Sequence, residues 1–503
     1  MSEAAPPPCP PLPAFLPLNF AFNRRSELRP EQAERGIPLV GDGRRLRLKL
    51  RSGLPISIAA VGASNFARGG CLWQLQGNGT RCSQQDVAGP DEETGLAKGW
   101  LLQAFQAIQR TWPHPAHRLH NSGIGARHAD SFTHCFNRFV PDDADALIIG
   151  FSEMCDGKHH TIGFKTQTFH QGFVGVETLM RIALSRPDPP ALLLFGHYRF
   201  GCGKGGKLRC NFEAQCDSQL TSLAQWYHAS VLSMWNALYH DASNSVYQDL
   251  LDGKTKSNPY YHKSWSIDGG VHLDLHKGDR MIAELVYSWV RRLVERSAPI
   301  SGRDMLGRMP GPLGGNPEIS FGSSICFDFA EAVGKVGGRA PSVVRAHGWE
   351  YVTYDRGMEN GAIVSKYKPG MKTTSAKSVL ELDTTIGTTR SHGGGHDSDG
   401  KFRLGYLQTY SSNATAALTC VAPCTCGSHS INAHSKARTS LTTFTPWIRF
   451  SLSQQKPCVL RLELLTEGEL FKVIALHVAS YAASIRAVGK QARLDAKGLG
   501  GEG

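Results

Sequence analysis

The sequence predicts an α/β domain built on a parallel sheet, followed by a β-sandwich. Up to about residue 297, apolar runs of four to eight residues alternate with longer segments of helical periodicity. This alternation is expected where crossover helices join parallel strands. Beyond about residue 320, short apolar runs follow one another between turn residues, which is typical of a sandwich of the jelly-roll kind. A chain of 503 residues has room for both domains.

The alternation in the first part assigns its elements in order. Continuous apolar runs predict buried strands at residues 56–61, 144–151 and 190–195. Apolar residues at helical spacing predict helices at residues 95–110, 174–184, 220–238 and 281–294, with a Cys- and Gly-rich loop at 200–217. Catalytic residues are expected at the carboxyl ends of the strands, where open parallel sheets hold their ligands.

The second part contains only short apolar segments, at residues 362–364, 379–382, 404–407, 416–420, 459–465 and 471–478. Changes in composition and in the pattern of apolar runs along the chain predict the domain boundaries. Residues 1–50 read as a Pro-rich and basic leader, disordered or loosely attached. Residues 51–297 form the α/β domain, 298–320 a Gly/Pro linker, 321–482 the sandwich and 483–503 a tail.

Composition excludes several classes of partner. The formal net charge is +12, but the basic residues are scattered and no nucleic-acid-binding motif occurs, so no nucleic acid is expected. No apolar run of about 18 residues occurs, so the sequence predicts no transmembrane span. The oligomeric state stays open.

The chain holds thirteen cysteines, and two clusters account for six of them. The first cluster is Cys202, Cys210 and Cys216; the second is Cys420, Cys424 and Cys426, with Cys458 later in the chain. Disulfides in an oxidising compartment are one explanation, with the pairing left open. Neither cluster has the paired CxxC spacing of a zinc site, so we expect no metal, and no cofactor is predicted.

The localisation stays open because two signals disagree. The cysteine content and the sequons at Asn78 and Asn413 favour a secretory or extracellular protein. Residues 1–17, however, show neither the basic start nor the apolar stretch of a signal peptide.

Three residue types in the α/β part have the chemistry of a catalytic triad. A hydroxyl is a weak nucleophile until a base takes its proton, and an acid holds the base in the right tautomer. Ser64 ends the apolar run 59–63 in a small-residue turn, and Asp268 and His272 precede the last helix. Two alternatives remain: Ser64 as a simple helix cap, and His276 with Asp274 as the base and its acid.

These segments, taken in order, resemble the SGNH (GDSL-type) hydrolases, esterases and lipases with a flavodoxin-like α/β/α fold. The resemblance covers about residues 50–295 and is carried by the Ser64 turn, the glycine block 120–126, the strand at 143–149 and the Asp–His segment 266–284. Among SGNH proteins it is nearest to plant and algal ones with a C-terminal β-sandwich. It implies a triad of Ser64, His272 and Asp268, and an oxyanion hole formed by the backbone N–H groups of Ser64, Gly125 and Ala126.

Two departures from the family pattern bear on activity. Three residues separate Asp268 from His272 where the family has two, and Gly269 and Gly270 can absorb the extra residue. The family also has an Asn after the third strand, and this chain has Met154 or Cys155 in its place, neither of which is a good donor.

The sequence therefore supports two hypotheses. The favoured one is an ester hydrolase that forms an acyl-Ser64 intermediate on a small-molecule or carbohydrate ester, with the sandwich as a binding module. The alternative is a catalytically weak or inactive SGNH-like protein that binds a glycan or a protein partner through the same cleft.

Overall fold

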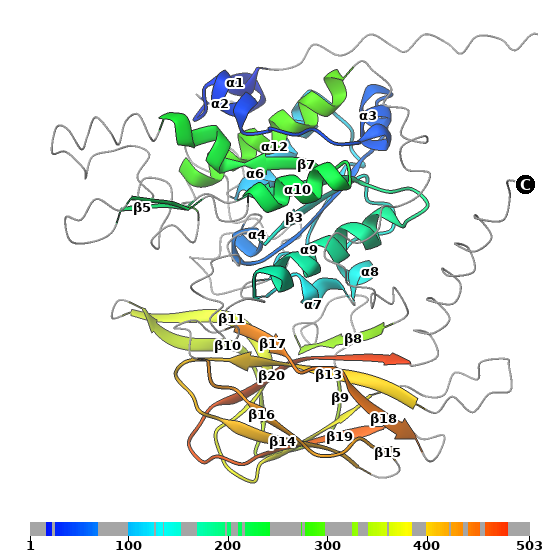
Figure 1. The fold of residues 1–503 in the computed structure, drawn as a ribbon, viewed down its shortest axis with the longest axis vertical. Coiled ribbons are helices and arrows are strands. Elements are labelled where there is room, and N and C mark those ends of the chain that lie inside the picture. Colours follow the sequence, from blue (N-terminus) through cyan, green and yellow to red (C-terminus); the bar gives the residue numbers. More distant parts are fainter. Residues whose placement is uncertain are drawn as a thin grey trace, which may run out of the picture.

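The computed structural model describes two domains stacked along the long axis of the molecule (Figure 1). It describes residues 17–22, 26–68, 99–124, 127–133, 135–151, 168–196, 199–202, 210–213, 217–241, 273, 277–296, 324–329, 341–359, 362–384, 399–421, 424–435, 441–452 and 458–480. None of the helices within these ranges is long and apolar enough to cross a membrane.

The first domain is built on a five-stranded parallel sheet of order β2-β1-β3-β4-β7. The strands are β1 (Ser57–Gly62), β2 (Arg118–Asn121), β3 (Ala146–Gly150), β4 (Ala191–Gly196) and β7 (Ser230–Ser233). A separate antiparallel pair, β5 (Arg199–Cys202) and β6 (Cys210–Glu213), overlaps the loop predicted at residues 200–217.

Helices cover both faces of this sheet, which gives three layers. Alternate residues of β1 face two different cores: Ile58 and Ala60 lie in one, Ala59 and Val61 in the other. The first core includes α6 (Trp100–Thr111) and α12 (Lys277–Glu295). The second includes residues of α7 (Asp130–Thr133), α8 (Phe136–Phe139), α9 (Thr168–Leu184) and α10 (Asp217–Trp226). The predicted α/β/α fold is confirmed.

One predicted element is wrong. Residues 220–238 were expected to form a single helix, but α10 ends at Trp226 and the buried strand β7 follows. All four residues of β7 are buried, and a fully buried four-residue strand has the same apolar pattern as a stretch of buried helix.

The expected leader is also wrong where the structure describes it. Residues 17–22 and 26–51 contain α1 (Leu18–Ala21), α2 (Pro30–Arg35) and α3 (Arg44–Arg51). Leu28, Ile37, Leu46 and Leu50 of this segment lie in the same core as α6 and α12. Its apolar residues are widely spaced between Pro and Arg residues, so its composition resembled that of a disordered segment although the described part is folded onto the domain.

The second domain is a sandwich of two antiparallel sheets, as predicted. Both sheets contribute residues to one core, including Phe402 and Leu476 from the first and Leu418 and Leu462 from the second. The first sheet contains β8 (Ser324–Asp328), β10 (Glu350–Glu359), β11 (Ala362–Thr373), β13 (Asp399–Gln408), β15 (Cys424–Thr425), β17 (Leu441–Phe444), β18 (Ile448–Leu452) and β20 (Phe471–Ser480). The second contains β9 (Ser342–His347), β12 (Val379–Asp383), β14 (Thr415–Val421), β16 (His429–Asn432) and β19 (Val459–Leu464).

Three disulfides occur among the described residues. Cys420–Cys426 and Cys424–Cys458 pair all four residues of the second predicted cysteine group within the sandwich. Cys135–Cys326 joins the two domains, because Cys135 directly precedes α8 and Cys326 lies in β8. In Figure 1, α7, α8 and β8 lie where the domains meet.

Candidate active site

The turn that carries Ser64 lies at the carboxyl ends of β1 and β3. Ser64 is half-buried and begins α4 (Ser64–Arg68), two residues after β1 ends. The backbone N–H of Ala63 donates to the carbonyl oxygen of Gly150 at the end of β3, at 3.2 Å. A Cβ at Gly62 or Gly150 would collide with the ring of Phe66. Glycine at both strand ends therefore lets this ring pack under the turn.

Asn65, the residue after Ser64, connects this turn to the segment that carries the predicted base. Its Oδ1 accepts the backbone N–H of Leu273 at 3.1 Å, across 208 residues of sequence. The indole N–H of Trp100 donates to the carbonyl oxygen of Asn65 at 3.0 Å, and Asn65 is 1% exposed. Leu273 directly follows His272, so folding brings the backbone beside His272 to the residue beside Ser64.

The loop after β2 runs alongside the same turn. The N–H groups of Ser122 and Ile124 donate to the carbonyl oxygens of Ala60 and Gly62 at 2.9 and 3.0 Å, which extends the parallel ladder past the end of β2. The Asn121 side chain donates to the carbonyl oxygen of Phe66 at 2.8 Å and accepts the N–H of Gly123 at 2.9 Å. The glycine block is thereby fixed to α4 as well as to β1.

The structure describes only part of the predicted site. It places Ser64, Asn121 and Gly123 at one edge of the sheet. The other predicted residues lie outside the described residues: Asp268, His272, Gly125, Ala126, the rival pair Asp274 and His276, and Met154 and Cys155. Their roles remain predictions, although described neighbours of His272 and Gly125 contact the Ser64 turn and its loop.

Three structurally important residues near this edge were not predicted. Asn65 belongs to the turn that marked Ser64, but the sequence gave no reason to assign it a partner. Arg127 and Asp328 form an ion pair between the domains, with each side chain 3% exposed. They lie 201 residues apart, so no local pattern relates them.

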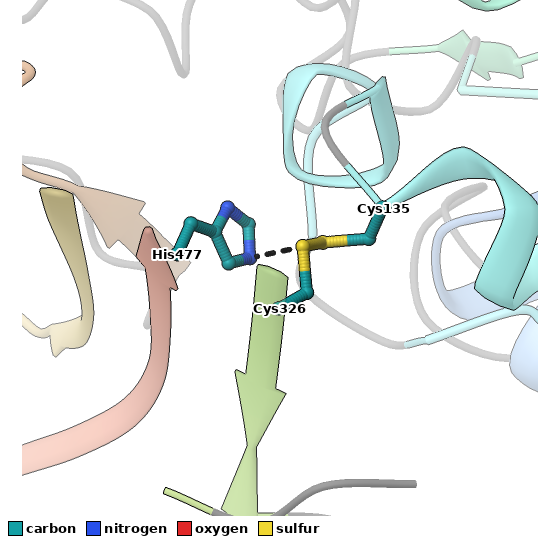
Figure 2. A group of neighbouring side chains, drawn as sticks. All are labelled: Cys135, Cys326 and His477. Atoms are coloured by element: carbon teal, nitrogen blue, oxygen red, sulfur yellow. Dashed lines mark hydrogen bonds between the residues drawn. A yellow bond between two sulfur atoms is a disulfide. The ribbon is translucent and has the colours of Figure 1, made fainter. Parts of the chain in front are cut away.

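A second cluster of reactive side chains lies between the domains. His477 Nε2 is 3.4 Å from Cys135 Sγ of the Cys135–Cys326 disulfide (Figure 2). Arg403 Nε donates to His477 Nδ1 at 3.1 Å, and a guanidinium N–H can only donate. Nδ1 is therefore the acceptor and Nε2 carries the proton, which points at sulfur. This arrangement is a hydrogen-bonded disulfide, and the histidine nitrogen that faces the sulfurs offers no lone pair to a metal.

Comparison with known proteins gives similarity in structure alone. No family model and no curated protein matches the chain. A two-domain esterase (CEX) described as active on acetylated mannans is 13% identical, with a TM-score of 0.49 over 89% of this chain and 98% of that one. A catalytic mutant of Axe2, an acetylxylan esterase from Geobacillus stearothermophilus, is 13% identical, with a TM-score of 0.33 over 48% of this chain and 95% of that one.

LAE5, an α/β hydrolase from the metagenome of Lake Arreo, is 11% identical, with a TM-score of 0.32 over 48% of this chain and 99% of that one. These identities and TM-scores are too low to assign an activity to the present chain.

Proposed function

We propose that this chain is an ester hydrolase that uses Ser64 as its nucleophile. The observation that carries the proposal is the hydrogen bond of 3.1 Å from Leu273 N–H to Asn65 Oδ1. A triad needs a hydroxyl and an imidazole within hydrogen-bonding reach of each other. Ser64 and His272 are far apart in the sequence, and this bond joins the residue that follows Ser64 to the residue that follows His272. Ser64 also stands at the carboxyl edge of a parallel sheet, where such folds place their active sites.

In the proposed reaction, His272 takes the proton from Ser64 Oγ while Asp268 holds the imidazole in its reactive tautomer. The oxygen attacks the ester carbonyl, and the developing oxyanion is stabilised by the N–H groups of Ser64, Gly125 and Ala126. His272 returns the proton to the leaving alcohol, and water then hydrolyses the acyl-Ser64. We propose an acylated carbohydrate as the substrate class, which remains the expectation drawn from the sequence.

The test combines active-site labelling with turnover of a small acyl ester. We expect a fluorophosphonate probe to label the wild-type chain, and Ser64→Ala to abolish both labelling and turnover. His272→Ala should lower kcat by about 10⁴-fold or more, as loss of a triad member does. His276→Ala is the matched control and should keep wild-type turnover. The assignment of the base is wrong if the two histidine variants exchange these results.

The alternative, a weak or silent protein that binds a glycan or a protein partner, is favoured by one observation. Met154 or Cys155 stands where SGNH hydrolases carry a donor Asn, and one such donor is worth about 3 to 4 kcal/mol of transition-state stabilisation. A native chain that is not labelled at Ser64, but that binds acylated oligosaccharide, would establish this alternative.

A further inference from the structure

The loop after β2 is held from both sides, by two different domains. On the nearer side, Ile124 N–H donates to the carbonyl oxygen of Gly62, two residues before Ser64. On the other side, the Arg127 guanidinium pairs with the carboxylate of Asp328, the last residue of β8 in the sandwich. Only Gly125 and Ala126 stand between the two attachments, and they are the predicted oxyanion donors.

The Arg127–Asp328 ion pair is buried between the two domains. Both side chains are 3% exposed, so solvent and salt screen this ion pair much less than they would screen a pair at the surface. Removal of either partner takes from the other buried group the opposite charge that it has in this pair, which is costly for a buried ion. The position of Arg127 is therefore tied to that of β8.

A second attachment fixes β8 itself. Cys326 lies two residues before Asp328, so both side chains point to the same face of β8. Cys326 is bonded to Cys135, eight residues after Arg127, so residues 127–135 are fastened to β8 at both ends. His477 on β20 is the register partner of Cys326 and donates to Cys135 Sγ (Figure 2).

We propose that the β-sandwich is a working part of the esterase site, with Arg127 as a positioning residue for the oxyanion loop. The inference rests on the proposed function. Oxyanion donors stabilise the transition state only if they are held in place before charge develops. A loop released at Arg127 should therefore weaken the transition state more than the bound substrate, which lowers kcat and leaves KM nearly unchanged.

The test uses the full-length chain with Arg127→Met, Asp328→Asn and the conservative Arg127→Lys. In the first two variants, we expect kcat to fall by about 10- to 100-fold with KM within about twofold, and the backbone amide of Ile124 to exchange at least about tenfold faster. Arg127→Lys keeps the charge and should recover part of both losses. Glu381→Gln is the control: it breaks a partly exposed ion pair with Arg461 in the other sheet of the sandwich and should change neither kcat nor the exchange of Ile124.

The outcomes separate this inference from the proposed function. A wild-type chain with no turnover and no labelling at Ser64 would refute the proposed function, and the exchange of Ile124 would then decide alone. Faster exchange in Asp328→Asn supports the sandwich as the support of this loop; unchanged exchange overturns it. Should Arg127→Met or Asp328→Asn not fold, Arg127→Lys and Asp328→Glu decide: wild-type kcat and wild-type Ile124 exchange in both overturn the inference.

Discussion

Asn65 acts at the scale of a single side chain, where one amide oxygen joins two distant segments at the candidate site. Asn65→Ala removes the acceptor of the buried Leu273 N–H, and an unpaired buried donor costs about 1 to 3 kcal/mol. We expect the free energy of unfolding, measured in urea, to fall by that amount. We expect kcat to fall as well, because Leu273 loses its hydrogen bond and directly follows His272, the predicted base. Asn432→Ala provides the control, since Asn432 is exposed and accepts only a local bond from His434 N–H.

A loss of kcat in Asn432→Ala equal to that in Asn65→Ala would contradict this role. So would an Asn65→Ala variant that keeps both its stability and its turnover.

His117 gives the fold a dependence on pH. Its Nδ1 accepts the N–H of Ile56 at 3.0 Å and its Nε2 lies 2.7 Å from the carbonyl oxygen of Trp112, so the ring is held neutral. Burial, as the largest cause, lowers the pKa of His117 below its ordinary value. Below about pH 6.5 the unfolded chain takes up a proton that the folded chain resists, so the contribution of His117 lowers stability as pH falls and does not change with pH above that value.

We expect His117→Asn, which keeps an acceptor for Ile56 but does not titrate, to reduce this slope between about pH 6.5 and pH 5. The measurement is urea unfolding at several pH values, and an unchanged slope would contradict the assignment. His120 adds a contribution of the same sign, because burial followed by the charge of Arg118 lowers its pKa too. The variant should therefore retain part of the slope.

The sequence predicts the turn that carries Ser64 more readily than the distant residues that contact this edge of the sheet, for a physical reason. Ser64 follows an apolar strand directly, so its place at the strand end can be read locally. Asn65 finds its partner 208 residues away and Arg127 finds Asp328 201 residues away. These contacts depend on the assembled fold, and a single sequence holds no pattern for them.

At the scale of elements, α3 tests whether the described segment 26–51 belongs to the domain. Leu46 is fully buried in the core beside α12, whereas Leu48 on the same helix is 46% exposed. Leu46→Ala should therefore cost about 2 to 5 kcal/mol of unfolding free energy, and Leu48→Ala less than about 0.5 kcal/mol. Urea unfolding of the two variants measures the difference, and a loosely attached leader would leave both variants as stable as the wild type.

Long elements with a regular pattern were predictable, and short buried ones were not. The helix expected at residues 281–294 corresponds to α12, and the strand expected at 144–151 contains β3. The four residues of β7 were assigned to a helix, because burial on both faces removes the alternation that marks a strand. The helices α2 and α3 were missed because Pro and Arg dominate the composition around them.

At the scale of the whole molecule, the sequence predicted two domains but not how they join. The sandwich was expected as a separate binding module after a linker. Its β8 instead carries two residues that contact the first domain, Cys326 and Asp328. The Cys135–Cys326 pair depends on how the two domains pack, so the spacing of the thirteen cysteines along the sequence did not indicate it.

The Cys135–Cys326 disulfide should stabilise the fold more than Cys420–Cys426, because the two close loops of very different length. The sequence separations are 191 and 6 residues, and the chain entropy removed from the unfolded state grows with the logarithm of that length. The difference amounts to about 3 kcal/mol at 25 °C. We therefore expect Cys135→Ala/Cys326→Ala to lower the Tm, measured by calorimetry under oxidising conditions, clearly more than Cys420→Ala/Cys426→Ala.

The two disulfide variants also show whether the domains unfold together or separately. With the long-range disulfide gone, the buried Arg127–Asp328 pair is the remaining described ion pair between the domains, and it breaks when either domain unfolds. We expect the wild-type chain to unfold in one transition, the Cys135→Ala/Cys326→Ala variant in two, and the Cys420→Ala/Cys426→Ala variant in one. Equal shifts in Tm with one transition in both variants would mean that the Cys135–Cys326 disulfide does not govern the joint unfolding of the domains, and that their non-covalent contacts, the Arg127–Asp328 pair among them, are enough to couple them.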